Sequence, residues 1–217
     1  MADQRSRAGV SYLSDEILKY VTGVHASHDG ALERAFTSPE REGLPSIQVA
    51  PSEGRLLQIL LRLAGASKVV EVGTLAGYSA IWMARALPPG GRLWSVEVSA
   101  RHARAARANL EAAGLAERVT VLQGEALRVL PTIERHGPFD AVFLDADKEN
   151  YAPYGAWAAK HVRPGGLLLA DNAFFFGRLM EAGKEAVSVR RLHEESRTSF
   201  ETVCIGTGDG LLVGVRR

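Results

Sequence analysis

The sequence predicts an α/β fold built on a doubly wound, mostly parallel sheet of seven strands. Apolar runs of strand length alternate with helical stretches through the middle of the chain, which is the pattern of β-α-β units. These runs occupy residues 69–72, 93–98, 119–122, 139–144 and 167–170. Two further runs, at 200–205 and 211–215, are separated by a glycine-rich segment too short for a crossover helix, so they predict an antiparallel C-terminal hairpin.

Helical periodicity fills the intervals between these strands. The predicted helices cover residues 79–87, 100–113, 126–135 and 154–161. An additional amphipathic helix begins at Ser52 and Glu53 and ends near Gly65. The first 50 residues are polar and contain two short helical patterns, so we expect extra N-terminal helices that form an arm or lid.

Length and composition narrow the possible partners and compartments. A chain of 217 residues fits one large domain with a sizeable core. The net charge of +1 gives no general attraction to nucleic acid or to an anionic membrane. A single cysteine, Cys204, excludes an internal disulfide and fits a reducing compartment, and the chain contains no apolar run of about 18 residues. We therefore expect a cytoplasmic protein without a membrane partner.

Acidic residues follow two of the predicted strands. Asp145 comes directly after the run at 139–144, and Asp171 and Asn172 come after the run at 167–170. Because the carboxyl ends of neighbouring parallel strands share one crevice, these side chains are expected to converge. Their oxygens suit a hard divalent cation such as Mg²⁺. Lys148 adds a candidate proton acceptor, since a nearby divalent charge and burial favour its neutral form; a solvated surface lysine is the alternative.

A glycine-containing loop follows the first strand of the sheet. Glu71, Gly73 and Gly77 give the pattern Glu-x-Gly-x-x-x-Gly, in which an acid replaces the first glycine of the dinucleotide fingerprint. This acid would repel a pyrophosphate but favours a cationic ligand without phosphates, such as S-adenosylmethionine. Glu97 ends the next strand, where a carboxylate can accept both ribose hydroxyls. The loop therefore predicts a nucleoside-type cofactor.

From about residue 40 to residue 217, the chain resembles the cation-dependent class I O-methyltransferases, which include the catechol and caffeoyl-coenzyme A enzymes. The matching blocks are residues 70–80, 95–97, 145–151, 165–172 and 209–210. The resemblance implies a Rossmann-like fold in which residues 1–217 form a single S-adenosylmethionine-dependent methyltransferase domain, with residues 1–50 as the arm or lid. It also implies a homodimer.

The resemblance further assigns roles to individual residues. The cofactor would be held by Val49, Glu71, Gly73, Ser79, Glu97, Ala126 and Asp145. Ala126 stands where the catechol enzymes have a serine near the adenine, so one adenine contact is absent at that place. Asp145, Asp171 and Asn172 would bind the cation, which we expect to be Mg²⁺, with Mn²⁺ and Ca²⁺ as alternatives. Lys148 would be the catalytic base.

The expected reaction is methyl transfer from S-adenosylmethionine to a hydroxyl of a catechol-type small molecule, that is, a vicinal aromatic diol. A methyltransferase for a hydroxylated nucleoside in tRNA remains an alternative, because some bacterial proteins that modify tRNA resemble this chain. A nicotinamide-dependent oxidoreductase is another, and the charge of Glu71 argues against it. A scaffold without catalytic activity would leave the acids and Lys148 unexplained.

Several weaker signals are also interpreted. Asp147 is expected to cap a helix that begins near Asn150 rather than to bind the metal. Three consecutive phenylalanines could line a substrate pocket or belong to the core; they are Phe174, Phe175 and Phe176. His25 and His28 are expected on the surface, and Cys204 as a small buried side chain. A solvated helix face is expected for the arginines Arg101, Arg104 and Arg107, with an RNA-binding patch as the alternative.

Overall fold

The computed structural model describes residues 3–9 and 12–217, and its centre is a seven-stranded sheet. The strands are β1 (Lys68–Val72), β2 (Arg92–Glu97), β3 (Val119–Gln123), β4 (Phe139–Leu144), β5 (Val162–Ala170), β6 (Phe200–Ile205) and β7 (Leu211–Arg216). Their order is β3-β2-β1-β4-β5-β7-β6, and the first five strands along the chain are parallel. β7 is antiparallel to both β5 and β6, so the predicted sheet and hairpin are confirmed.

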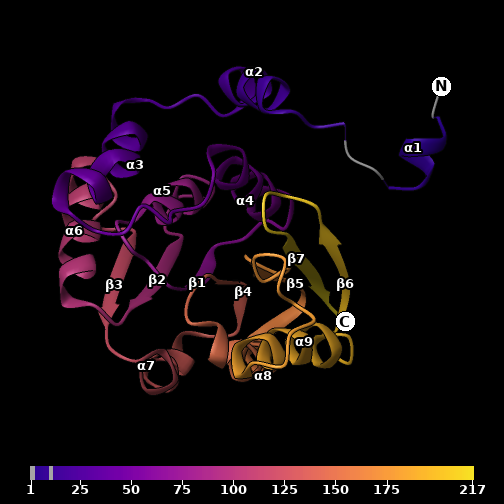
Figure 1. Cartoon of the computed structure of the whole chain (residues 1–217). Coiled ribbons are helices and arrows are strands. Elements are labelled where there is room, and N and C mark those ends of the chain that lie inside the picture. Colours follow the sequence, from indigo (N-terminus) through magenta and orange to yellow (C-terminus); the bar gives the residue numbers. More distant parts are fainter. Residues whose placement is uncertain (1–2, 10–11) are drawn as a thin grey trace.

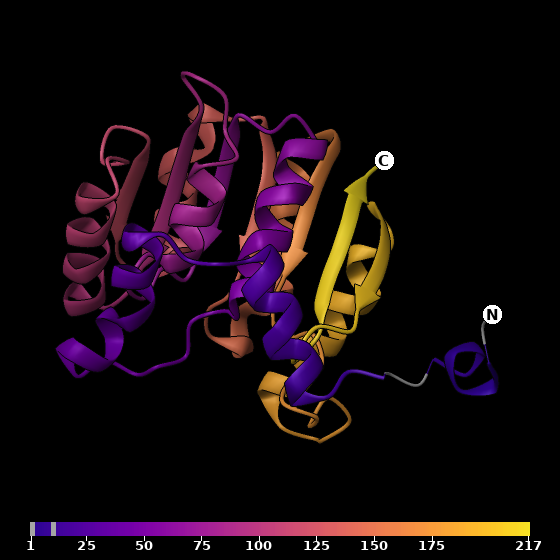
Figure 2. The same ribbon diagram turned by 90° about the horizontal axis from the view of Figure 1, so that it is seen from above.

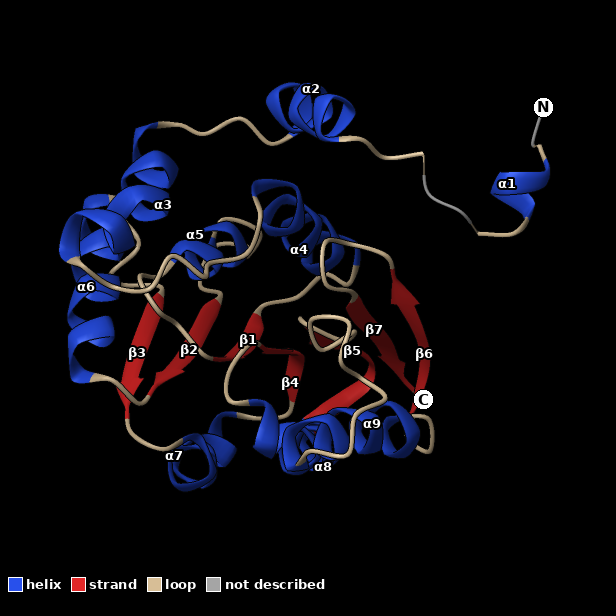
Figure 3. Cartoon of the chain, in the orientation of Figure 1, coloured by secondary structure: helices blue, strands red, loops and turns tan. Residues whose placement is uncertain are grey.

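Helices cover both faces of the sheet (Figures 1 and 3). One layer contains α3 (Gly30–Glu42), α4 (Pro51–Leu63), α5 (Tyr78–Ala84) and α6 (Ala100–Ala112), and the other contains α7 (Ala126–Ile133), α8 (Tyr151–His161) and α9 (Lys184–Ser196). The N-terminal helices α1 (Gln4–Arg7) and α2 (Asp15–His25) precede these layers, and α1 projects away from them (Figure 2). Among the described residues, none of the helices has the length and apolar character needed to cross a membrane.

The two layers have separate hydrophobic cores because strand side chains alternate between faces. Along β1, Val69 packs in the core beneath α4, α5 and α6, whereas Val70 and Val72 pack in the core beneath α7, α8 and α9. All three valines are at most 1% exposed. Burial on both faces explains why the parallel strands read as nearly continuous apolar runs.

The short helix α1 was not predicted, and α5 and α8 differ from their predicted bounds by about three residues at one end. Two further differences are larger. α9 was not predicted, because its buried positions are few and small and lie among charged residues. β5 is longer than predicted and begins at Val162, since the sequence Pro164-Gly165-Gly166 normally interrupts a strand and hid its first half.

The chain changes direction across the sheet between β1 and β4. It proceeds outward from β1 through β2 and β3, and then returns to place β4 on the opposite side of β1. The backbone of Asp145 continues this pairing, since its N–H donates to the carbonyl of Val72 at 2.8 Å. Likewise, the Asp171 N–H donates to the carbonyl of Leu144 at 2.9 Å. The reversal of strand order between β1 and β4 leaves a crevice at the carboxyl ends of these strands, which is the usual ligand site in open α/β sheets.

Candidate active site

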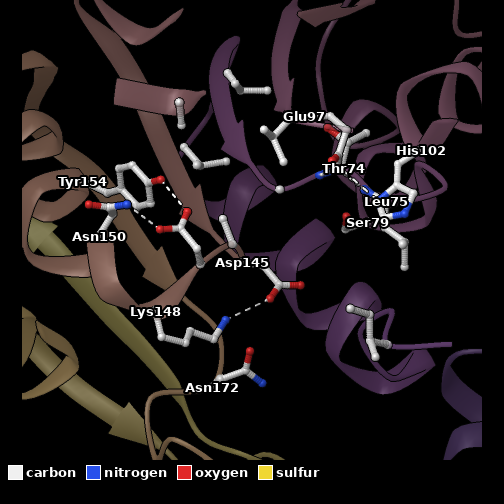
Figure 4. Close-up of a pocket in the computed structure, with 18 of the residues that line it drawn as sticks. Thr74, Leu75, Ser79, Glu97, His102, Asp145, Lys148, Asn150, Tyr154 and Asn172 are labelled. Atoms are coloured by element: carbon white, nitrogen blue, oxygen red, sulfur yellow. Dashed lines mark hydrogen bonds and ion pairs between the residues drawn. The ribbon is translucent and has the colours of Figure 1, made fainter. Parts of the chain in front are cut away.

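A cavity of about 730 Å³ opens at this crevice (Figure 4). Most of the residues predicted to bind ligands line it, namely Val49, Gly73, Ser79, Glu97, Ala126, Asp145, Lys148 and Asn172. Glu71 and Asp171 lie behind this wall, at 0% and 6% exposure. The structure therefore brings together residues that are up to 123 positions apart in the chain, from Val49 to Asn172.

The turn after β1 requires glycine at position 73. Gly73 has φ +98°, and a Cβ added there would overlap the carbonyl oxygen of Asp145. The loop after β1, here called the cofactor loop, can approach the end of β4 this closely only because Gly73 has no side chain. Gly77, with φ +82°, is the N-cap residue that precedes α5. The two glycines thus fix the loop against the rest of the site.

Glu97 at the end of β2 is held in place by backbone donors. Its Oε2 accepts the N–H groups of Thr74 at 3.2 Å and Leu75 at 2.9 Å, and its Oε1 accepts the N–H of Ser99 at 2.8 Å. His102 Nδ1 lies 3.5 Å from the same Oε1 and also lines the cavity. The carboxylate is thus fixed at the cavity wall, with acceptor capacity left for ligand hydroxyls.

Glu71 lies beneath the cofactor loop. Its two carboxylate oxygens accept hydrogen bonds from the hydroxyls of Ser79 and Ser95. Burial raises the pKa of Glu71 to about 7, although both hydroxyls act in the opposite direction. Glu71 is therefore separated from the cavity by Ser79, which is itself on the cavity wall.

The candidate cation ligands lie side by side at the ends of β4 and β5. Asp145 and Asn172 face the same part of the cavity (Figure 4), and Asp171 is buried next to them. Asn172 has φ +52°, a left-handed conformation that asparagine adopts more readily than most residues. Within residues 3–9 and 12–217, no three acidic, histidine or cysteine side chains form a metal-binding group. The candidate set therefore depends on the amide oxygen of Asn172.

A third acid, Glu53 of α4, is buried beside these residues. Burial, together with the charge and hydrogen bond of Asp171 and the charges of Asp145 and Asp209, raises its pKa to about 9. Burial and the charge of Asp145 likewise raise the pKa of Asp171 to about 6. Among the described residues, Glu53 Oε1 has no hydrogen-bond partner. Burial and the nearby aspartates thus keep Glu53 protonated at neutral pH.

Lys148 is the cationic residue in contact with this group of acids. It is 9% exposed, so the surface-lysine alternative is wrong. Its Nζ lies 3.4 Å from Asp145 Oδ1 and donates to the hydroxyl of Tyr151 at 2.6 Å. Lys148 begins a short 3₁₀ turn (Lys148–Asn150) that leads into α8, and this turn directs its side chain into the crevice.

Asp147 has a different role from the predicted one. It occupies the cap position of the 3₁₀ turn but makes no side-chain bond to the helix backbone. Its carboxylate instead accepts the hydroxyl of Tyr154 at 2.6 Å and the amide of Asn150. The predicted helix cap is therefore wrong, and Asp147 ties the turn to α8 through side chains.

The three phenylalanines at 174–176, predicted to lie either in a substrate pocket or in the core, do not share one environment. Phe175 is 3% exposed and belongs to the core, whereas Phe176 is 62% exposed and lines the cavity. Phe174 packs against the backbone of Gly210 in the C-terminal hairpin. Only Phe176 is thus placed to contact a bound molecule.

Several weaker signals are resolved by their contacts. His28 is not a free surface residue, because Nε2 pairs with the Tyr78 hydroxyl at 2.7 Å and Nδ1 with Glu33 at 2.8 Å. His25 is exposed, as expected, and Cys204 is only half-buried. In α6, Arg101, Arg104 and Arg107 are all exposed, as expected of a solvated helix face, and Arg101 and Arg107 also donate to the backbone carbonyls of Glu42 and Val121.

Three residues of the site were not predicted. Glu53 was interpreted as a helix start and Tyr151 only as part of a family motif, while His102 was only one residue of the helix predicted at 100–113. Their positions depend on how α4, α6 and α8 pack over the sheet. For Tyr151 a local signal was present, because it lies three residues after Lys148, a spacing at which side chains of a helical turn can meet.

Residues 26–217 match the family model described as O-methyltransferase. Because this match spans most of the chain, the protein belongs to this family and is an S-adenosylmethionine-dependent O-methyltransferase. A protein of Niastella koreensis named catechol O-methyltransferase is 42% identical over 173 residues, which are 79% of this chain and 78% of the relative.

Solved structures share the fold over nearly the whole chain. The O-methyltransferase of Bacillus cereus in complex with SAH has 36% identity and a TM-score of 0.88, covering 92% of this chain and 96% of that one. The O-methyltransferase TomG of Streptomyces achromogenes, involved in tomaymycin synthesis and solved with SAM, has 33% identity and a TM-score of 0.89. That match covers 99% of both chains.

Proposed function

We propose that the protein transfers a methyl group from S-adenosylmethionine to one hydroxyl of a vicinal aromatic diol, with the help of a divalent cation. The observation that carries this proposal is the grouping of Asp145, Asn172 and Lys148 in the same cavity as the glycine loop. The relative named catechol O-methyltransferase supports the substrate class. Phe176, which lines the cavity, offers an aromatic surface to such a ring.

The donor set fits a hard cation. Asp145, Asp171 and Asn172 would hold it with oxygen ligands, which Mg²⁺ prefers and Mn²⁺ and Ca²⁺ accept. The unpartnered Glu53 Oε1 and the raised pKa values of Glu53 and Asp171 support this fit, because a cation would offset the neighbouring aspartate charges that contribute to both shifts. When bound, such a cation supplies electrostatic stabilisation to the deprotonated acceptor oxygen.

The methyl donor would occupy the part of the cavity next to the glycine loop. Glu97 is fixed at the end of β2, where it can accept the ribose hydroxyls, and Val49 and Ala126 line the same cavity. Gly73 and Ser79 would contribute backbone and hydroxyl contacts. Asp145 lines the same cavity as Gly73 and Asn172, so it would contact both the donor and the cation. The buried charge of Glu71 favours the positively charged donor over a phosphate-bearing cofactor.

The reaction is an in-line displacement in which the acceptor oxygen attacks the methyl carbon as the carbon–sulfur bond breaks. A phenol is a good nucleophile only after losing its proton, and Lys148 would take that proton. The neutral S-adenosylhomocysteine leaves, so the positive charge of the sulfonium ends on the lysine as a proton. The cavity positions the two reactants against each other.

The remaining proposals concern assembly and location. We place residues 1–217 in one catalytic domain with residues 1–50 as an arm, in a cytoplasmic homodimer. Four large apolar side chains of α2 are exposed, which supports an arm that packs against a second copy; they are Ile17, Leu18, Tyr20 and Val24.

A panel of acceptors tests the substrate class and the cation together. Catechols, flavonoids and hydroxylated nucleosides are incubated with labelled S-adenosylmethionine, with and without EDTA. Transfer to a diol that stops in EDTA and returns with Mg²⁺ is expected. Transfer only to a nucleoside, with tRNA binding that weakens steeply with salt, would instead favour the RNA alternative. Full activity on a diol in EDTA would remove the cation from the mechanism.

A further inference from the structure

Tyr151 is a buried tyrosine whose hydroxyl joins the base to the ends of two strands. It is the first residue of α8 and is 0% exposed. Its hydroxyl accepts a hydrogen bond from Lys148 Nζ at 2.6 Å. The same hydroxyl faces the carbonyl oxygens of Asp171 at 3.1 Å and Leu144 at 3.3 Å. It therefore lies beneath the ends of both β4 and β5.

The direction of these bonds follows from the groups involved. Carbonyl oxygens only accept, so the single proton of the Tyr151 hydroxyl is donated to Asp171 or Leu144. Its oxygen is then left to accept from Lys148. A tyrosine hydroxyl carries its proton at neutral pH and can make this donation. The arrangement thus has one consistent orientation.

This orientation determines which position of the Lys148 amine is left for its lone pair. A neutral amine has two N–H groups and one lone pair. Tyr151 accepts one N–H, and Asp145 Oδ1, at 3.4 Å, is the acceptor for the other. In the neutral form in which Lys148 would act as the base, the remaining tetrahedral position holds the lone pair, and Lys148 lines the cavity. The Lys148 Nζ also lies 4.5 Å from the centroid of the Tyr151 ring, so the ring itself limits the movement of the amine.

We propose that Tyr151 is a positioning residue that orients the amine of Lys148 so that its lone pair meets the proton of the acceptor hydroxyl. This proposal rests on the proposed function, in which Lys148 is the base. A ring that only filled the core would need no hydroxyl, and the buried hydroxyl here joins three groups of the site. Tyr151 itself touches neither substrate.

A double-mutant cycle of Tyr151→Phe and Lys148→Ala tests the proposal. The phenylalanine keeps the ring and removes the hydroxyl. We expect Tyr151→Phe to lower kcat by about 10- to 100-fold, the loss typical of a hydrogen bond to an ionisable group. The KM for both substrates and the affinity for Mn²⁺, measured by titration, should stay within about twofold. In the Lys148→Ala background, the second substitution should have no further effect on kcat.

The outcomes separate the two proposals. If Lys148→Ala lowers kcat but Tyr151→Phe does not, the positioning role is wrong and the base stands. If Tyr151→Phe lowers kcat equally in the unmodified protein and in Lys148→Ala, the effect does not pass through the lysine. The hydroxyl then has a general structural role, and the positioning role is again wrong. If Lys148→Ala itself leaves kcat unchanged, the base assignment fails and the role of Tyr151 fails with it.

A second variant covers a failure of Tyr151→Phe to fold. Difluorotyrosine incorporated at position 151 keeps the ring and the donated proton but makes the oxygen a weaker acceptor. A reduced kcat at unchanged KM is expected, and an unchanged kcat would overturn the proposal.

Discussion

Gly73 and Asp145 are in direct backbone contact, since any side chain at position 73 would overlap the carbonyl oxygen of Asp145. The first residue belongs to the loop after β1 and the second to the loop after β4. The cofactor loop and the loop that carries the candidate cation ligand are therefore packed together without an intervening side chain. A displacement of one loop moves the other.

Gly73→Ala should destabilise the protein strongly. Positive φ at a residue with a side chain costs about 1–3 kcal/mol, and overpacking adds about as much, so the free energy of unfolding should fall by about 2–6 kcal/mol. Gly114→Ala is the matched control, because Gly114 has φ +69° but no atom within 4 Å of an added Cβ. Urea unfolding measures both. Equal losses in the two variants would contradict the close contact.

Lys148→Ala should lower kcat by about 10²–10⁴-fold if the lysine is the base. The KM for the diol and the donor should change little. Lys160→Ala, which removes an exposed lysine from the same region of the chain, is the control and should retain full activity. A loss confined to KM would make Lys148 a binding residue instead.

Asp171→Ala should remove both the Mg²⁺ requirement and most of the activity. Cation binding can be followed without turnover, by Mn²⁺ titration and by thermal unfolding. At about 100 times its Kd, a cation should stabilise the unmodified protein by about 2.7 kcal/mol, because it binds only the folded state. The variant should show no such gain. The same stabilisation in both proteins would place the cation elsewhere.

Glu71 makes folding stability depend on pH. Its pKa is about 7 when folded and buried, against 4.5 as its ordinary value. Between these values the folded protein keeps a proton that the unfolded chain has lost. Stability from this group is therefore complete below pH 4.5 and is lost as the pH rises through about 7. The loss amounts to about 3 kcal/mol for this shift.

Comparison with Glu71→Gln isolates this effect, because Glu53 and Asp171 titrate in both proteins. Denaturant unfolding between about pH 5 and about pH 8, without cofactor, should show the unmodified protein losing more stability than the variant. Parallel curves would show that Glu71 titrates normally. S-adenosylmethionine should reduce the difference, since its positive charge favours the ionised acid.

The sheet and part of the site could be predicted because both follow from local patterns. Buried parallel strands read as apolar runs, and the acids that follow them converge at one edge of the sheet, as Asp145 and Asn172 do. Glu53 and Tyr151 were beyond such reasoning, because each reaches the site from a helix packed over the sheet. The burial of Glu71 was hidden for a similar reason, since its partner Ser95 lies on a neighbouring strand.

The crossing of the chain from β1 to β4 separates the two substrates along the sequence. Every residue proposed to bind the methyl donor lies at or before position 145, whereas Lys148, Asn172 and Phe176, which are proposed for the acceptor side, lie after it. Exchange of the later loops among homologous genes would thus diversify the molecules that are methylated while retaining the common source of the methyl group.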